Sequence, residues 1–173
     1  MNRYCFGLLM VILCFSNADA KNYFTIEQAQ KSIFPNTSFV KSPIVLTSEQ
    51  QNKMTDASSV KLPFDSSNIW KGNDGSWFIV DQVVGKHEFI TYAIGIGTLG
   101  SIKDIEILEY NESYGYEIKE KSWLKQFFGK TNANPIKLNT DIDNISGATL
   151  SCKHLSDGIK RVLTMHELVL KNH

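Results

Sequence analysis

The sequence predicts an α+β fold in which an antiparallel β-meander is covered by a long C-terminal helix and accompanied by short helices. Three successive segments, 76–84, 87–97 and 102–110, are rich in β-branched and aromatic residues. The joints between them are short and contain glycine, which favours hairpins and hence antiparallel pairing. Residues 149–173 then carry apolar side chains at helical spacing.

The N-terminus has the pattern of a secretory signal peptide over residues 1–20. Arg3 precedes an apolar run from Tyr4 to Phe15, and small residues at Ala18 and Ala20 follow it. We therefore expect cleavage after Ala20 and an exported, periplasmic protein. An uncleaved segment would instead serve as a membrane anchor.

Composition limits the remaining possibilities. Of 173 residues, 42% are apolar, and 18 basic residues balance 18 acidic ones, so no basic surface for nucleic acid is expected. Cys152 is the one cysteine outside the signal and excludes an internal disulfide. We interpret it as a partly buried small residue. The chain divides into a signal (1–20), a segment of short helices and loops (21–70) and a main domain (71–173).

Two capping-box patterns open short helices near the start of the mature chain. Thr25 is followed three residues later by Gln28, and Pro35 ends that helix. Thr47 and Gln50 repeat the pattern and open a polar, surface helix. Residues 56–68 indicate a loop.

The predicted strands lead into a turn and a short helix. Alternate residues of the second strand fall on one face of the sheet, and these are Ile90, Tyr92, Ile94 and Ile96. Residues 112–130 indicate a glycine turn and then an aromatic-rich helix that ends at Gly129. Residues 134–138 indicate another brief strand.

The terminal helix should cover one face of the meander. Its inward positions share helical spacing and are Leu155, Ile159, Val162, Leu163, His166 and Val169. Asp157–Arg161 and Glu167–Lys171 are spaced as i,i+4 ion pairs, which we place on the outer face of the helix.

The stretch "DNISGATLS", residues 143–151, allows two interpretations. In the first it is a turn, with Gly147 in an unusual backbone conformation and Thr149 capping the terminal helix. In the second, the unhindered hydroxyl of Thr149 lies at a helix N-terminus, where unpaired N–H groups and the helix dipole stabilise an attached phosphate.

The string Asp143–Thr149 resembles the D-x-x-[ST]-G-A-T flavinylation motif of the FMN-binding domain family. That domain occurs in the C subunit of the sodium-translocating NADH:quinone reductase and in the G subunit of the Rnf complex. The resemblance implies that a flavin transferase, using FAD and Mg²⁺, attaches FMN covalently to Thr149 through a phosphoester. It also implies that the neighbouring residues serve the transferase and the flavin phosphate, namely Asp143, Ser146, Gly147, Ala148 and Ser151.

A second stretch upstream resembles the turn E-T-P-G-L-G that lies beside the flavin in this family. The turn reads Glu112-Ser113-Tyr114-Gly115-Tyr116-Glu117, with tyrosine in place of the family's proline and glutamate in place of its second glycine. It is similar to that of single-domain, exported members. The resemblance implies cofactor-binding roles for Glu112, Ser113, Tyr114, Gly115 and Tyr116. Tyr114, Tyr116 and Trp123 are candidates for packing on the flavin ring, although Trp123 and Phe127 are equally interpreted as core residues.

Other motifs are excluded by their context. The stretch 95–100, "GIGTLG", joins two strands, whereas a dinucleotide-binding glycine loop opens a helix. The four histidines, His87, His154, His166 and His173, lack metal-ligand spacing, so we expect no metal site.

Three function classes remain open. The first is an electron carrier that relays electrons between membrane or periplasmic redox proteins. The second is a flavin-dependent reductase with its own small substrate, and the third is a cofactor-free binding module. No acid–base pair is evident in the sequence, which favours the carrier.

Overall fold

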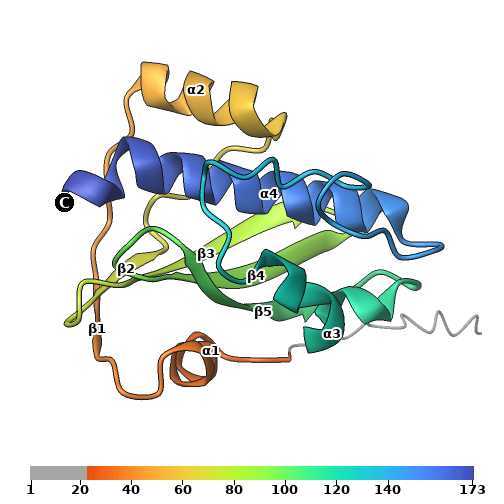
Figure 1. Ribbon diagram of the computed structural model, residues 1–173, viewed down its shortest axis with the longest axis horizontal. Coiled ribbons are helices and arrows are strands. Elements are labelled where there is room, and N and C mark those ends of the chain that lie inside the picture. The colour runs from red at the N-terminus through yellow and green to blue at the C-terminus, as the bar shows by residue number, and fades with distance from the viewer. Residues whose placement is uncertain (1–22) are drawn as a thin grey trace, which may run out of the picture.

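The computed structural model describes residues 23–173, so the predicted signal peptide lies outside the described residues. Its centre is a five-stranded antiparallel sheet in which each strand pairs with the next along the chain (Figure 1). The strands are β1 (Phe39–Lys41), β2 (Ile69–Gly72), β3 (Trp77–Val84), β4 (Phe89–Ile96) and β5 (Ile102–Tyr110). Within residues 23–173, no helix is both long and apolar enough to cross a membrane.

Helices cover both faces of the sheet (Figure 1). The long α4 (Thr149–Leu168) lies across one face, and α2 (Ser48–Ser58) packs on the outer side of α4. On the opposite face, α1 (Ile26–Ile33) packs against β4 and β5. A short helical stretch follows β5 and comprises η1 (Tyr116–Lys119), α3 (Lys121–Leu124) and η2 (Lys125–Phe127), and η3 (Leu170–Asn172) ends the chain. The predicted α+β meander with its long C-terminal helix is confirmed.

The main core lies between the sheet and α4. The alternate residues Ile90, Tyr92, Ile94 and Ile96 of β4 are fully buried there, as their spacing predicts. The inward side chains of α4, including Leu155, contribute from the other side. Each such side chain stabilises the fold by about 1.5–3 kcal/mol. A smaller cluster under α1 covers the other face of the sheet.

Both predicted capping boxes are present. At α1, Gln28 N donates to Thr25 Oγ1 at 3.2 Å and Thr25 N donates to Gln28 Oε1 at 2.8 Å. The same pair of bonds joins Thr47 and Gln50 at the start of α2. These reciprocal bonds satisfy two backbone donors at each helix start.

Three features of the fold differ from the sequence prediction. Strands β1 and β2 were not predicted, because they are only three and four residues long and each carries a lysine, a residue that is uncommon in strands. Conversely, residues 134–138 form only an isolated bridge from Leu138 to Ile142. Ile136 has a φ of 51°, which breaks the extended backbone that a strand needs.

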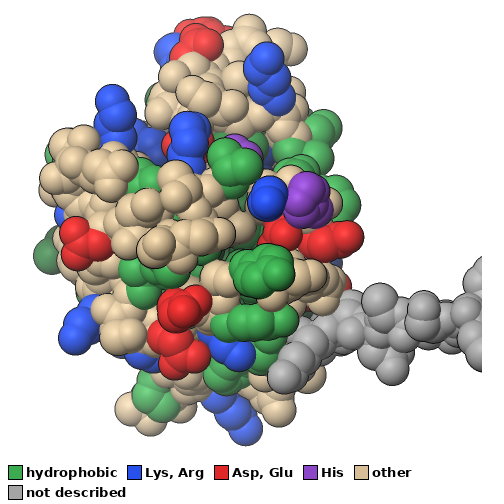
Figure 2. Space-filling view, turned by 90° about the vertical axis from the view of Figure 1, so that its right-hand side faces the viewer, with side chains coloured by type: hydrophobic (Ala, Val, Ile, Leu, Met, Phe, Trp, Pro, Cys, Tyr) green, Lys and Arg blue, Asp and Glu red, His purple; other side chains and the backbone are tan. Residues whose placement is uncertain are grey.

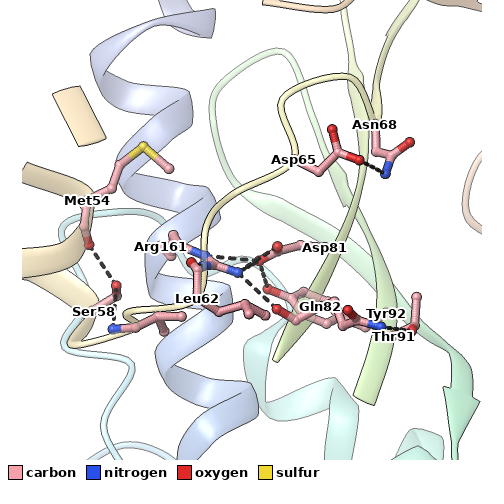
Figure 3. A network of polar contacts seen from close by, with 11 residues as sticks. Met54, Ser58, Leu62, Asp65, Asn68, Asp81, Gln82, Thr91, Tyr92 and Arg161 are labelled. Carbon is pink, nitrogen blue, oxygen red and sulfur yellow. Dashed lines mark hydrogen bonds and ion pairs between the residues drawn. The ribbon is translucent and has the colours of Figure 1, made fainter. Parts of the chain in front are cut away.

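The predicted pair Asp157–Arg161 is wrong. Arg161 points inward, and its side chain is 2% exposed and bound to Asp81 of β3, with Nη2 2.6 Å from Oδ1 (Figure 3). Arg161 also donates to the carbonyls of Leu62 and Gln82. Asp157 pairs instead with Lys153, one turn earlier. The spacing within the helix suggested the wrong partner, because Asp81 lies on β3 and meets Arg161 only when the helix packs on the sheet. The second predicted pair, Glu167–Lys171, is confirmed at 2.7 Å.

Candidate functional site

A pocket of about 500 Å³ opens at the end of the molecule where α4 begins. Its walls are the β3–β4 turn at residues 86–88, the segment 111–114 after β5, and residues 147–151 at the start of α4. Figure 2 views the molecule from this end, and apolar, basic, acidic and histidine side chains lie close together on this face. The two sequence stretches that were singled out therefore meet in one pocket.

Helix α4 begins at this pocket without a side-chain cap. Ala148 is the N-cap residue and Thr149 the first helical residue, so the expectation that Thr149 caps the helix is wrong. The first intrahelical bond runs from Cys152 N to Ala148 O at 2.9 Å. The N–H groups of Thr149, Leu150 and Ser151 precede it and have no acceptor in the preceding turn. All three residues line the pocket, which gives it the positive end of the helix dipole.

The hydroxyl of Thr149 is accessible. The residue is exposed, and Asn144 Nδ2 donates to Thr149 Oγ1 at 3.0 Å, which fixes the position of that oxygen. Gly147 has a φ of +84°, as expected for the turn, and no atom lies within 4 Å of the place that its Cβ would occupy. Space next to Thr149 is therefore open to an attached group.

Gly115 and Ala148 bring the two motif stretches into direct contact. Gly115 has a φ of +79°, and a Cβ added there would collide with the Cβ of Ala148. Tyr110 OH donates to the carbonyl of Tyr114 at 2.6 Å and holds the same turn from below. Burial raises the pKa of Tyr110 to about 12, so the phenol remains a donor at neutral pH.

Glu112 is buried and holds the β3–β4 turn. Its Oε1 accepts from the backbone N–H groups of His87 at 2.7 Å and of Glu88 at 3.1 Å. Burial opposes ionisation of this carboxyl, but the backbone N–H groups outweigh it and lower the pKa of Glu112. From the other side, His154 Nδ1 lies 2.7 Å from Val84 O. The negative charge of Glu112 is thus used within the protein and stabilises one wall of the pocket.

The predicted cofactor-binding residues divide into two groups. Those that line the pocket are Glu112, Ser113, Tyr114, Gly147, Ala148, Thr149 and Ser151. Those that do not line it are Asp143, Ser146, Gly115 and Tyr116. Of these, Asp143 acts through its backbone, since its carbonyl accepts from Trp123 Nε1 at 2.8 Å and its N–H donates to Gln126 Oε1 at 2.8 Å.

The aromatic residues that were candidates for packing on the flavin ring differ in their exposure. Tyr114 is 78% exposed at the pocket, whereas Tyr116 packs edge-on against Tyr110. Trp123 and Phe127 are buried and pack against each other with ring centroids 5.3 Å apart. The interpretation of Trp123 and Phe127 as core residues is therefore confirmed.

Sequence reasoning missed five residues that line the pocket: Lys86, His87, Glu88, Asn111 and Leu150. A signal for most of them existed in the predicted meander. Antiparallel pairing places Ile90 opposite Tyr110, so the turn before β4 and the segment after β5 lie at the same edge. The position of the helix start at that edge could not be read from the sequence.

This arrangement fits a cofactor that carries both a phosphate and a planar ring. The uncapped helix start offers N–H donors to a phosphate, and Lys86 adds positive charge at the mouth. Tyr114 and Leu150, the latter 46% exposed, offer apolar surface to a ring. A volume of about 500 Å³ is within the range of small-molecule sites.

Comparison with known proteins agrees with this chemistry. A search of curated proteins found no match to the chain. Residues 85–164 match the model of the FMN-binding domain, and this range includes every residue that lines the pocket. Residues 85–164 are therefore similar to the FMN-binding domain, and this match supports FMN as the cofactor.

Proposed function

We propose that the protein is an exported electron-transfer flavoprotein that carries FMN as a phosphoester on Thr149. The observation that carries this proposal is the exposed hydroxyl of Thr149 at the uncapped start of α4, inside a pocket built from both motif stretches. Residue type, accessibility and a phosphate-binding environment coincide at this one atom.

The attachment is a phosphoryl-type transfer from FAD. Thr149 Oγ1 forms a bond to the phosphorus of the FMN half, while the bond between that phosphorus and the bridging oxygen breaks. AMP leaves with the bridging oxygen, and the threonine proton passes to a base of the transferase, with Mg²⁺ neutralising the pyrophosphate. Asn144 holds Oγ1 in place through its 3.0 Å hydrogen bond.

The residues of the chain then hold the attached group. The N–H groups at the start of α4 face the phosphate, and the dipole alone stabilises its charge by about 0.3–1 kcal/mol. Tyr114 and Leu150 supply apolar surface for the ring. FMN itself supplies reversible redox chemistry, which nearby charges tune.

A carrier fits the open pocket better than a reductase does. A reductase needs a substrate pocket with placed acid–base groups. Here the carboxylate of Glu112 is bound to backbone N–H groups, and His87 is exposed at the mouth. A carrier needs an exposed flavin edge and no such groups. Its electron donor would be a membrane protein and its acceptor a periplasmic redox protein, and a covalent tether would keep the flavin on a protein outside the cytoplasm.

Intact mass measurement tests the proposal. We expect the protein from its native compartment to lack residues 1–20 and to carry the mass of one FMN less one water on the peptide containing Thr149. Thr149→Ser keeps a hydroxyl and should still be modified, whereas Thr149→Val should not. Covalent flavin on the valine variant, or an unmodified wild type after incubation with transferase, FAD and Mg²⁺, would disprove the attachment.

Reduction kinetics separate the carrier from the reductase. A carrier should exchange electrons with several small redox proteins and show no saturable turnover of a small organic substrate. Saturable turnover by the flavinylated wild type would favour the reductase.

A further inference from the structure

Thr149 borders two cavities. Besides the pocket described above, it lines a cavity of about 580 Å³ on its other side. The walls of this second cavity are residues 57–59 at the end of α2, the loop 135–139, and the α4 residues Thr149, Lys153, Asp157 and Lys160. We call it the lysine cavity, because Lys137, Lys153 and Lys160 all line it.

The three lysines of this cavity differ in how they are engaged. Lys160 Nζ donates to the carbonyls of Asn132 at 2.6 Å and Asn134 at 3.0 Å, which fixes it against the loop. Lys153 is paired with Asp157, and its side chain is 51% exposed. Within residues 23–173, Lys137 Nζ has no hydrogen bond or ion pair. Two ammonium groups are therefore available to a ligand.

Lys153 is the better placed of the two. It lies four residues after Thr149 and hence on the same face of α4, one turn along. Its ammonium group binds Asp157 one turn further along α4, and because Thr149 and Lys153 line the same cavity, a change of rotamer would turn this group toward Thr149. Lys137, by contrast, lies on the loop that forms the opposite wall.

The pairing of Lys153 with Asp157 is easily exchanged. It is an i,i+4 pair whose basic member is half exposed, and such pairs contribute little to stability. The basic residue also precedes the acidic one, which is the less favourable order on a helix. A phosphodiester on Thr149 would bring a new negative charge within reach of the same ammonium group.

We propose that Lys153 is a charge partner of the flavin phosphate on Thr149, reaching it from the lysine cavity while the N–H groups at the start of α4 contact it from the pocket at Tyr114. This inference rests on the proposed attachment to Thr149. It places the phosphate at the border of the two cavities, and it gives Lys153 a positioning role rather than a catalytic one.

The test compares Lys153 of α4 with Lys171 of η3. Lys153→Gln removes the proposed partner, and Lys171→Gln is the matched control, because Lys171 also forms an i,i+4 pair, with Glu167, and is 58% exposed at the far end of the helix. Each full chain is incubated with transferase, FAD and Mg²⁺, and covalent FMN is followed by mass. We expect attachment about two- to fivefold slower for Lys153→Gln, the size of a partly exposed ion pair, and unchanged for Lys171→Gln. Lys153→Arg should restore the rate.

A second readout does not depend on the rate of the transferase, because it is made on fully flavinylated protein. Melting temperatures are compared for the flavinylated and unmodified forms of each variant. Flavinylation should raise the melting temperature less in Lys153→Gln than in Lys171→Gln, while the unmodified variants melt together.

The outcomes separate this inference from the proposed function. Modified wild type with equal rates and equal melting shifts for the two glutamine variants would overturn the role of Lys153 and leave the attachment standing. A loss in Lys137→Gln without one in Lys153→Gln would overturn it too. An unmodified wild type would overturn both proposals together.

Discussion

Arg161 of α4 and Asp81 of β3 form a buried ion pair, with Nη2 of the arginine 2.6 Å from Oδ1 of the carboxylate. The Tyr92 hydroxyl donates to the second carboxylate oxygen at 2.7 Å. The guanidinium also binds the Leu62 and Gln82 carbonyls, so one side chain joins the helix, the sheet and the loop before β2 (Figure 3). This contact fixes where α4 lies along the sheet, and thereby where its first residue meets the pocket.

We expect Arg161→Met to destabilise the protein by about 3–5 kcal/mol, because it leaves a buried carboxylate without its partner. Adding Asp81→Asn should recover part of this loss, since the second change removes the stranded charge. Urea unfolding of the three proteins checks the prediction. Lys171→Met removes an exposed pair and should cost less than about 1 kcal/mol. Equal losses of free energy of unfolding in Arg161→Met and Lys171→Met would show that the buried ion pair contributes no more to stability than the exposed one.

Glu112 should make stability depend on pH on the acid side. Its pKa in the folded protein lies below the ordinary value of 4.5, because backbone N–H groups outweigh the effect of burial. A lowered folded pKa contributes stability that is present above the unfolded pKa and is lost as the pH falls through the folded value. Glu112→Gln should therefore be less stable than wild type by about 1–2 kcal/mol at pH 7, and the difference should shrink below pH of about 4. Urea unfolding across this range measures it; a difference independent of pH would contradict the assignment.

Gly115→Ala should lower the free energy of unfolding more than Gly129→Ala does. Both glycines have positive φ, +79° and +76°, so both variants bear the left-handed backbone penalty of about 1–2 kcal/mol. A Cβ at Gly115 also collides with Ala148. At Gly129, by contrast, no atom lies within 4 Å of the position that a Cβ would take. For Gly115→Ala alone, we expect the free energy of unfolding to fall by a further amount of about 1–3 kcal/mol, and FMN attachment to be slower. Thermal unfolding and mass spectrometry check both effects, and identical behaviour of the two variants would refute the contact.

Thr149 and Thr47 should respond differently to substitution in the unmodified protein. Thr47 is a true N-cap whose hydroxyl accepts from Gln50 N at 3.2 Å, so Thr47→Ala should cost about 1 kcal/mol. Thr149 is the first residue of α4 and caps no backbone N–H, and its hydroxyl accepts only from the exposed Asn144 side chain, so Thr149→Ala should change the free energy of unfolding by less than about 0.5 kcal/mol. Chemical denaturation compares them. A loss at Thr149 as large as that at Thr47 would restore a structural reason for this threonine.

The sequence predicted the elements whose signals are local. Two capping boxes, the alternation of Ile90 and Tyr92, and the apolar stripe of α4 were confirmed because periodicity and cap chemistry act over a few residues. The partner of Arg161 was missed because Asp81 lies 80 positions away and is brought to it only by packing. In the same way, the motif identified Thr149, but Lys86 and His87 joined the pocket through strand pairing rather than through any pattern of their own.

The walls of the pocket at Thr149 come from three segments that are far apart along the chain. An extended chain would therefore offer an enzyme the linear motif but none of the surroundings of the attachment oxygen. Flavin attached before folding would lie in water, whereas flavin attached afterwards would lie between preformed walls. Flavin fluorescence and its sensitivity to a soluble quencher would then show whether the flavin was attached before or after folding. A flavin protected from the quencher would indicate a correctly folded protein.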